Sequence, residues 1–424
     1  MDLRDRDCDY SVSNTSESIA EHCVRRVDTI TRVDSQGRAS LEREYKALLR
    51  SHGLVSRFLP IPLHSYDRSA ALSFKIGRQL QFVWEWLSAN WGRRTALGPR
   101  DMFRLGRGDP MEELGNEVAS SFQQLGRAID VPVLVRTFPT GTFNAHVRVV
   151  SNGALILVNS ALKALLHQVT KVIGLSTPQL NPKPHLSEEQ LAEEFAKIVY
   201  AFLRFGDSRE AARLPLLDER TAFFSTALLY EAERFVVSHE YAHLAAGHLG
   251  DRPKTKIRTS AGMLEVLSVS RRQEEEADLL ACKALFNLRE DHPMRILFKE
   301  IYPRFHACGP LLLFALDDLL TDVVVNCPHL FSLSDSLARA IAKHITADGD
   351  NVAALSEIAP LDRAPAHLRL KWCREHFANT CSPDDLHLAD QIVSWIAGQT
   401  EIINTNFGGM SRLDARAWLR RRNF

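Results

Sequence analysis

The chain has 424 residues, of which 45% are hydrophobic and 25% are charged, and this suits a globular protein of two or three domains. Its 52 basic and 52 acidic side chains balance, so no overall field favours nucleic acid or an anionic membrane as a partner. The charge therefore gives no support to a nucleic-acid-binding role.

The cysteines and the N-terminal residues indicate where the chain works. Seven scattered cysteines form no C-x-x-C pair, which is typical of reduced cytosolic thiols. The first residues are too charged for the apolar core of a signal peptide, and the most apolar later stretch, Pro310 to Val325, is interrupted by Asp317, Asp318 and Asp322. We therefore expect a soluble, cytoplasmic protein with no membrane partner.

The first 130 residues are predicted to form two regions. Residues 1–66 combine a polar start with a helical stretch from Ser16 to Arg50, which predicts a mobile arm or a docking segment. Residues 67–130 are predicted as a helical region, in which side chains from Asp67 to Trp91 recur at the spacing of a core or interface helix.

Residues 131–290 change in pattern and are predicted to form the core domain. Between Val131 and Val158, three short segments have the period of β-strands, and Ser151-Asn-Gly153 suits a hairpin turn between the last two. Three helices are predicted, from Ser160 to about Val172, from Ser187 to Phe205 and from about Glu219 to Leu249.

The connecting and C-terminal segments complete the expected fold. The insertion 174–218 is long enough to form a lid or a substrate-selecting surface, and Asp251 to Lys256 is predicted as a loop followed by mostly helical sequence. Residues 291–424 are predicted as a helical C-terminal region. The patterns together predict a predominantly helical α+β fold with a small antiparallel sheet.

The third predicted helix contains His239-Glu-Tyr-Ala-His243, an H-E-x-x-H pattern. Residues four apart on a helix share a face, so the two imidazoles can converge on one tetrahedral Zn2+ ion. Glu240 is placed to take a proton from a metal-bound water rather than to bind the metal. The pattern also occurs by chance, but its apolar neighbours would make unpaired histidines and a buried glutamate costly.

A catalytic zinc site needs a third protein ligand, and an acidic run supplies the candidate. Glu274 and Asp278 lie four apart on a predicted helix, so Glu274 can bind zinc while Asp278 accepts a hydrogen bond from a ligand imidazole. Glu275 or Glu276 would replace Glu274 in another helical register. The alternative is a solvated acidic run at the start of a helix.

These segments resemble the gluzincin zinc metallopeptidases, in particular the HtpX-type and CAAX-prenyl-protease peptidases. The resemblance rests on H-E-x-x-H followed by Gly247-His248, on Arg272-Gln-Glu-Glu-Glu-Ala-Asp278, and on the upstream strand Phe143-Asn-Ala-His146. It implies a zincin-like core with an active-site helix, and an edge strand on which a substrate backbone can pair. His146 stands where the family usually has phenylalanine.

The resemblance is to a soluble core. HtpX-type enzymes have transmembrane helices, which are not expected here, and similar cores occur in the ImmA/IrrE regulators and in the Lit-type phage-exclusion peptidase. These resembling proteins are cytosolic and cleave one dedicated protein.

Three further residues are considered beside this resemblance. Ala364-Pro-Ala-His-Leu-Arg369 is similar to a late H-P-x-x-x-R-type segment of the family without its first histidine, and Arg369 is carried over as a site residue. His367 could stabilise the oxyanion, although a lone histidine is more often structural. His248 lies five residues past His243, off the ligand face, which indicates helix capping or packing.

The sequence therefore predicts a zinc-dependent endopeptidase with a protein or peptide substrate. A second hypothesis is a non-catalytic regulatory or scaffold protein whose H-E-x-x-H site is structural or accidental. A third keeps the enzyme as a conditional bacterial stress or antiphage protease, silent until an activating protein partner displaces the N-terminal arm.

Overall fold

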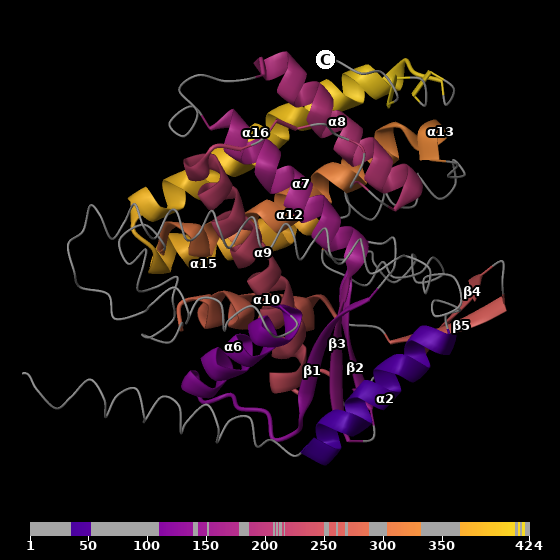
Figure 1. Cartoon of the computed structure of the whole chain (residues 1–424), viewed down its shortest axis with the longest axis vertical. Coiled ribbons are helices and arrows are strands. Elements are labelled where there is room, and N and C mark those ends of the chain that lie inside the picture. Colours follow the sequence, from indigo (N-terminus) through magenta and orange to yellow (C-terminus); the bar gives the residue numbers. More distant parts are fainter. Residues whose placement is uncertain are drawn as a thin grey trace, which may run out of the picture.

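The computed structural model of the chain shows the predicted predominantly helical α+β fold, with helices packed around a small sheet (Figure 1). The predicted helix from Asp67 to Trp91, and the predicted helical stretch before Ser35, lie outside the described residues. Apart from a few isolated positions, the structure describes residues 35–51, 110–138, 143–150, 152–177, 186–206, 217–249, 254–259, 262–267, 270–287, 303–331 and 365–411.

The helices lie on both faces of the sheet and in a further layer beyond it (Figure 1). The described helices up to Ala245 are α2 (Ser35–Ser51), α6 (Pro110–Gln124), α7 (Ser160–Ser176), α8 (Glu188–Phe205) and α9 (Glu219–Ala245). The C-terminal half contains α10 (Arg271–Leu285), α12 (Pro303–Asn326), α13 (Pro328–Phe331), α15 (Ala366–Thr380) and α16 (Pro383–Gly408).

The main sheet has the strand order β1-β3-β2, with β1 (Val133–Phe138), β2 (Ala145–Val150) and β3 (Gly153–Asn159). The predicted hairpin is confirmed, because β2 and β3 are antiparallel neighbours. The prediction of a wholly antiparallel sheet is wrong, since β1 runs parallel to β3. The reason is that β3 takes the central position, so the chain passes from one edge strand to the other before it returns to the middle.

Both faces of β3 are buried, which explains its continuous apolar sequence. Leu155 and Leu157 pack into a small cluster with α2, whereas Ile156 and Val158 face the main core. Tyr45 of α2 also donates a hydrogen bond to the carbonyl oxygen of Thr137 at 2.7 Å. Helix α2 therefore covers one face of the sheet.

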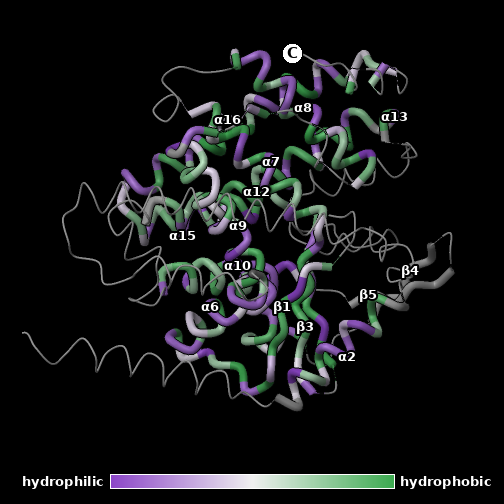
Figure 2. The backbone as a smooth tube through the Cα atoms, in the orientation of Figure 1, coloured by the Kyte–Doolittle hydropathy of each residue, from purple (hydrophilic) through white to green (hydrophobic). Residues whose placement is uncertain are grey.

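Helix α9 occupies the centre of the molecule. It packs against α6, α7, α10, α12 and the sheet. The contacts are made largely by buried apolar residues of the main core, and Figure 2 shows the hydropathy of these elements. At the crossing with α12, a Cβ atom on Gly309 would lie 2.6 Å from the backbone of Glu231, so only glycine permits this approach. The H-E-x-x-H pattern thus sits on a helix that other elements cover on several sides.

Helix α10 is fixed against α9 by a buried arginine. Arg234 donates hydrogen bonds to the carbonyl oxygens of Leu285 at 2.8 Å and Ala284 at 3.1 Å, at the C-terminal end of α10. Its Nε lies 3.0 Å from Glu117 of α6. A cation is favourable at this end of a helix, and here it locks three helices in place.

The interpretation of residues 174–218 as a lid does not fit α8. Phe195, Ile198 and Val199 of this helix are fully buried in the main core, and α8 packs against α7 and α16. It belongs to the layer of helices at the end of the molecule away from the sheet (Figure 1).

A second correction concerns the segment after α9. Strands β4 (Lys254–Thr259) and β5 (Gly262–Leu267) form an antiparallel hairpin where a loop and then helix were predicted. The alternation Lys-Thr-Lys-Ile-Arg-Thr has the two-residue period of a strand, which the prediction overlooked.

None of the helices in the described parts of the chain is both long enough and apolar enough to cross a bilayer.

Candidate metal centre

The two histidines of the H-E-x-x-H pattern lie on the buried face of α9. This helix starts at Asp218, whose side chain accepts hydrogen bonds from the backbone N–H groups of Arg220 and Thr221. His239 and His243 are one turn apart and both are buried. Their Nε2 atoms lie 3.1 Å apart, so the two rings converge as the spacing predicts.

Glu274 of α10 completes a cluster with these histidines. Helix α10 opens with a capping box, in which Ser270 and Gln273 exchange side-chain to backbone hydrogen bonds, and this sets the register of the acidic run. Glu274 is 1% exposed, and its carboxylate oxygens lie 3.5 Å from Nε2 of His239 and 3.6 Å from Nε2 of His243. Of the three glutamates that the sequence left open, Glu274 is the one that reaches both histidines.

The spacing of these atoms fits a tetrahedral metal ion. Zinc bonds to nitrogen and oxygen of roughly 2.0–2.1 Å place neighbouring ligand atoms about 3.4 Å apart at the corners of a tetrahedron. The separations here are 3.1, 3.5 and 3.6 Å. His239, His243 and Glu274 therefore form a buried His-His-Glu group that could hold a metal ion, and this donor set suits zinc.

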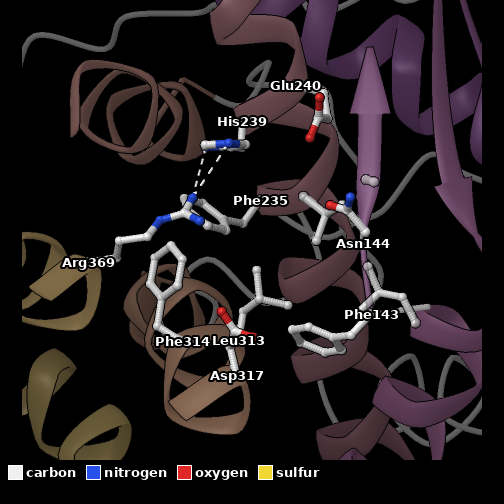
Figure 3. Close-up of a pocket in the computed structure, with 12 residues that line it drawn as sticks. Phe143, Asn144, Phe235, His239, Glu240, Leu313, Phe314, Asp317 and Arg369 are labelled. Atoms are coloured by element: carbon white, nitrogen blue, oxygen red, sulfur yellow. Dashed lines mark hydrogen bonds between the residues drawn. The ribbon is translucent and has the colours of Figure 1, made fainter. Parts of the chain in front are cut away.

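Asp278 and Arg369 stand behind the first histidine. Asp278, one turn after Glu274, has its Oδ1 atom 2.8 Å from Nδ1 of His239. Arg369 of α15 donates to both oxygens of Asp278, from Nε at 2.8 Å and from Nη2 at 2.7 Å. Its Nη2 also lies 3.4 Å from Nδ1 of His239 (Figure 3). The structure thus brings both predicted residues to the ligand cluster.

The charges of this group determine where the imidazole protons lie. Burial lowers the pKa of His239, but the hydrogen bond and charge of Asp278 outweigh burial and raise the pKa to about 9. Burial by itself raises the pKa of Asp278, but the charge and hydrogen bonds of Arg369, together with the contact to His239, lower it by a larger amount. The pKa of Asp278 therefore lies below its usual value, and the group is a carboxylate. A carboxylate at Nδ1 favours a proton on that nitrogen, leaves Nε2 facing the cluster, and makes His239 a more basic ligand.

Glu240 lines a pocket beside the cluster. Its carboxylate points across the pocket towards Asn144, which directly precedes β2, while His239 forms another part of the wall (Figure 3). Arg369 lines the same pocket. The remaining walls are largely apolar, and their apolar side chains are Phe143, Ala145, Leu162, Phe235, Val236, Leu313 and Phe314.

Two pocket residues of α12 were missed as site residues by sequence reasoning. The guanidinium of Arg369 stacks on the ring of Phe314, 4.5 Å from its centroid, and Asp317 lines the pocket one turn later. The signal was present, because Asp317 interrupts an apolar stretch; the sequence used it only to exclude a membrane span.

His248 contacts the second ligand rather than capping the helix with its side chain. Its Nδ1 lies 3.0 Å from Nδ1 of His243, and its Nε2 lies 3.3 Å from Glu276. The predicted capping role belongs to its backbone N–H, which donates to the carbonyl oxygen of His243 at 2.9 Å, whereas the prediction that His248 lies off the face of the two histidines is wrong. It failed because the helix was assumed to continue past Gly247, where the backbone instead turns with φ of +71°.

His367 and His146 lie away from the cluster. His367 is half-buried and does not line the pocket, and its electrostatic interaction is with Asp318. His146 packs its ring against Phe138, on the side of the sheet that α2 covers. The adjacent Ala145 lines the pocket, so the departure from the family pattern at His146 falls outside the pocket wall.

Comparisons of the chain with protein-family models, with curated proteins and with solved structures find no match. The functional assignment therefore depends on the geometry of the cluster.

Proposed function

We propose that the chain is a zinc-dependent endopeptidase in which His239, His243 and Glu274 hold the metal and Glu240 is the general base. The observation that carries the proposal is the convergence of a buried His-His-Glu group beside a pocket that Glu240 also lines. Among the described residues, three protein ligands converge and leave one tetrahedral position open, which is typical of catalytic zinc sites, whereas structural sites use four protein ligands.

The proposed reaction divides the chemistry between the metal and the chain. Held by His239, His243 and Glu274, zinc would supply Lewis acidity to a carbonyl and would lower the pKa of water towards ~7. Glu240 takes the proton of the attacking water as the C–O bond forms, and delivers it to the leaving amine as the C–N bond breaks. Asp278, held by Arg369, keeps His239 in the tautomer whose Nε2 can act as a ligand.

The pocket suits an extended peptide. Strand β2 is an edge strand of the described sheet, and its first residue, Ala145, lines the pocket together with the two residues before it, so a substrate backbone can add to this edge by hydrogen bonding. The apolar walls favour an apolar substrate side chain next to the bond that is cleaved.

The direct test is Glu240→Gln in the full chain, with Glu233→Gln as the matched control on the same helix. Glu233 is paired with Lys163 at 3.8 Å and does not line the pocket. We expect all three proteins to hold roughly one zinc ion per chain, and only the wild type and the control to cleave proteins when new N-termini are identified in expressing cells.

Two outcomes would change the conclusion. Full cleavage by the Glu240→Gln variant would show that Glu240 is not the base. Zinc in every protein without cleavage by any of them would support the regulatory or scaffold hypothesis.

The hypothesis of an activating partner can be tested by truncation of the N-terminal arm, provided that the shorter chain keeps α2. Because α2 covers one face of the sheet, removal of residues 1–66 would expose Leu155 and Leu157. The full chain should instead be compared with a chain that begins at Ser35. Faster proteolysis by the shorter chain would support inhibition by the arm, and equal rates would remove this idea.

A further inference from the structure

The turn that follows α9 folds the chain back onto the metal centre. On a continuing α-helix, a residue five positions past His243 would lie about 140° round the helix axis from it. Gly247 instead adopts a left-handed conformation, with φ of +71°, and the backbone N–H of His248 donates to the carbonyl oxygen of His243 at 2.9 Å. The His248 ring is thereby returned to the side of His243.

His248 links the second ligand to a carboxylate at the surface. Its Nδ1 lies 3.0 Å from Nδ1 of His243, and its Nε2 lies 3.3 Å from an Oε2 atom of Glu276. His248 is 6% exposed, whereas the Glu276 side chain is 58% exposed. The three side chains His243, His248 and Glu276 therefore form a row that runs from the buried cluster to solvent.

One arrangement of protons satisfies every contact in this row. A neutral imidazole has one donor and one acceptor nitrogen, so if Nε2 of His243 faces the metal as a ligand, its Nδ1 carries the proton. This N–H then donates to Nδ1 of His248, whose own proton must lie on Nε2. That N–H points to Glu276, which as a carboxylate can only accept.

We propose that His248 is a positioning residue for the ligand His243, and that Glu276 fixes the tautomer in which His248 can accept a hydrogen bond. This inference rests on the metal site of the proposed function. It gives each ligand histidine its own hydrogen-bond partner, Asp278 for His239 and His248 for His243. Loss of such a partner typically weakens metal binding by roughly 10–100-fold, and a neutral acceptor places His248 near the lower end.

The test replaces His248 with three side chains and measures the affinity of the full chain for Zn2+ alone. Alanine removes the acceptor. The Oδ1 atom of asparagine can take the place of the histidine Nδ1, whereas the longer glutamine reaches the place of Nε2. We expect His248→Ala and His248→Gln to lose roughly tenfold in zinc affinity, measured by competition with a chromophoric chelator, and His248→Asn to recover most of that loss.

A spectroscopic measurement separates positioning from a general loss of stability. The visible absorption spectrum of the Co2+-loaded protein depends on ligand geometry, so it should change in His248→Ala and return towards the wild type in His248→Asn. Thermal unfolding of the metal-free variants shows whether each one folds, and the comparison of Asn with Gln remains decisive if Ala does not.

The outcomes distinguish this inference from the proposed function. Equal zinc affinity of wild type and His248→Ala, or equal affinities of the Asn and Gln variants, would overturn the role of His248 while the metal site stands. A wild-type chain that takes up no zinc would overturn the metal site, and the role of His248 with it.

Discussion

The two histidines of the proposed metal site lie in different surroundings. Behind His239 stand Asp278 and Arg369, a charged pair that is 0% and 6% exposed. Behind His243 stands the ring of His248, whose other nitrogen faces an exposed carboxylate. The same task, fixing the orientation of an imidazole, is thus done by buried charge on one side of the centre and by a chain of hydrogen bonds to the surface on the other.

The two surroundings are expected to contribute differently to the stability of the fold and to metal binding. On the buried side, Arg369 joins α15 to α10 through Asp278, so the contact that orients His239 also holds two helices together. On the outer side, the contact of His248 with Glu276 joins the turn after α9 to α10. Substitutions on the buried side should therefore affect folding, whereas those on the outer side should affect mainly the metal.

The largest expected effect follows from Arg369→Met. It leaves Asp278 buried without its cation, and removal of one partner of a buried pair costs about 3–5 kcal/mol. Denaturant titration of the metal-free chain measures this loss. The control is Arg374→Met on the same helix, which breaks an exposed pair with Asp390 at 2.8 and 3.0 Å and should cost no more than ~1 kcal/mol. Similar losses in the two variants would contradict the distinction.

Asp278→Asn should weaken zinc binding by roughly 10–100-fold, because a neutral amide replaces the carboxylate that orients His239. Chelator competition on the full chain gives this ratio. If Asp278→Asn lost less zinc affinity than His248→Ala, the contact behind His239 would not be the stronger of the two, which contradicts the expected order.

The extent to which the site could be predicted depends on how local each contact is. The convergence of His239 and His243, and the shared face of Glu274 and Asp278, follow from the helical period alone, and the structure has both. The sequence also contained a signal for the register of α10, because Ser270 and Gln273 have the spacing of a capping box and so define where the helix begins.

Contacts that depend on a turn or on distant packing could not be predicted in this way. The position of His248 depends on the backbone conformation of Gly247, and Arg369 lies 91 residues from the carboxylate it binds. In the fold, the parallel pairing of β1 with β3 depends on the path of the chain between sheet edges. Side-chain periodicity reports which face of a strand is buried and gives no information on its neighbours.

The smallest expected effect follows from Glu276→Gln. Because Glu276 is exposed and its pairing is shared with water, the variant should lose less than about fivefold in zinc affinity. Glu275→Gln, which changes the neighbouring carboxylate, should bind zinc like the wild type. A loss from Glu276→Gln as large as that from Asp278→Asn would show that the outer side is not the weaker one.

The most direct test of the metal centre is zinc titration of the metal-free chain in the wild type, Glu274→Gln and Glu275→Gln. We predict roughly one tightly bound zinc ion per chain for the wild type and for Glu275→Gln, and a loss of tight binding for Glu274→Gln, because two imidazoles alone do not complete the site. Equal binding by Glu274→Gln and the wild type, or no zinc in any of the three, would contradict the account.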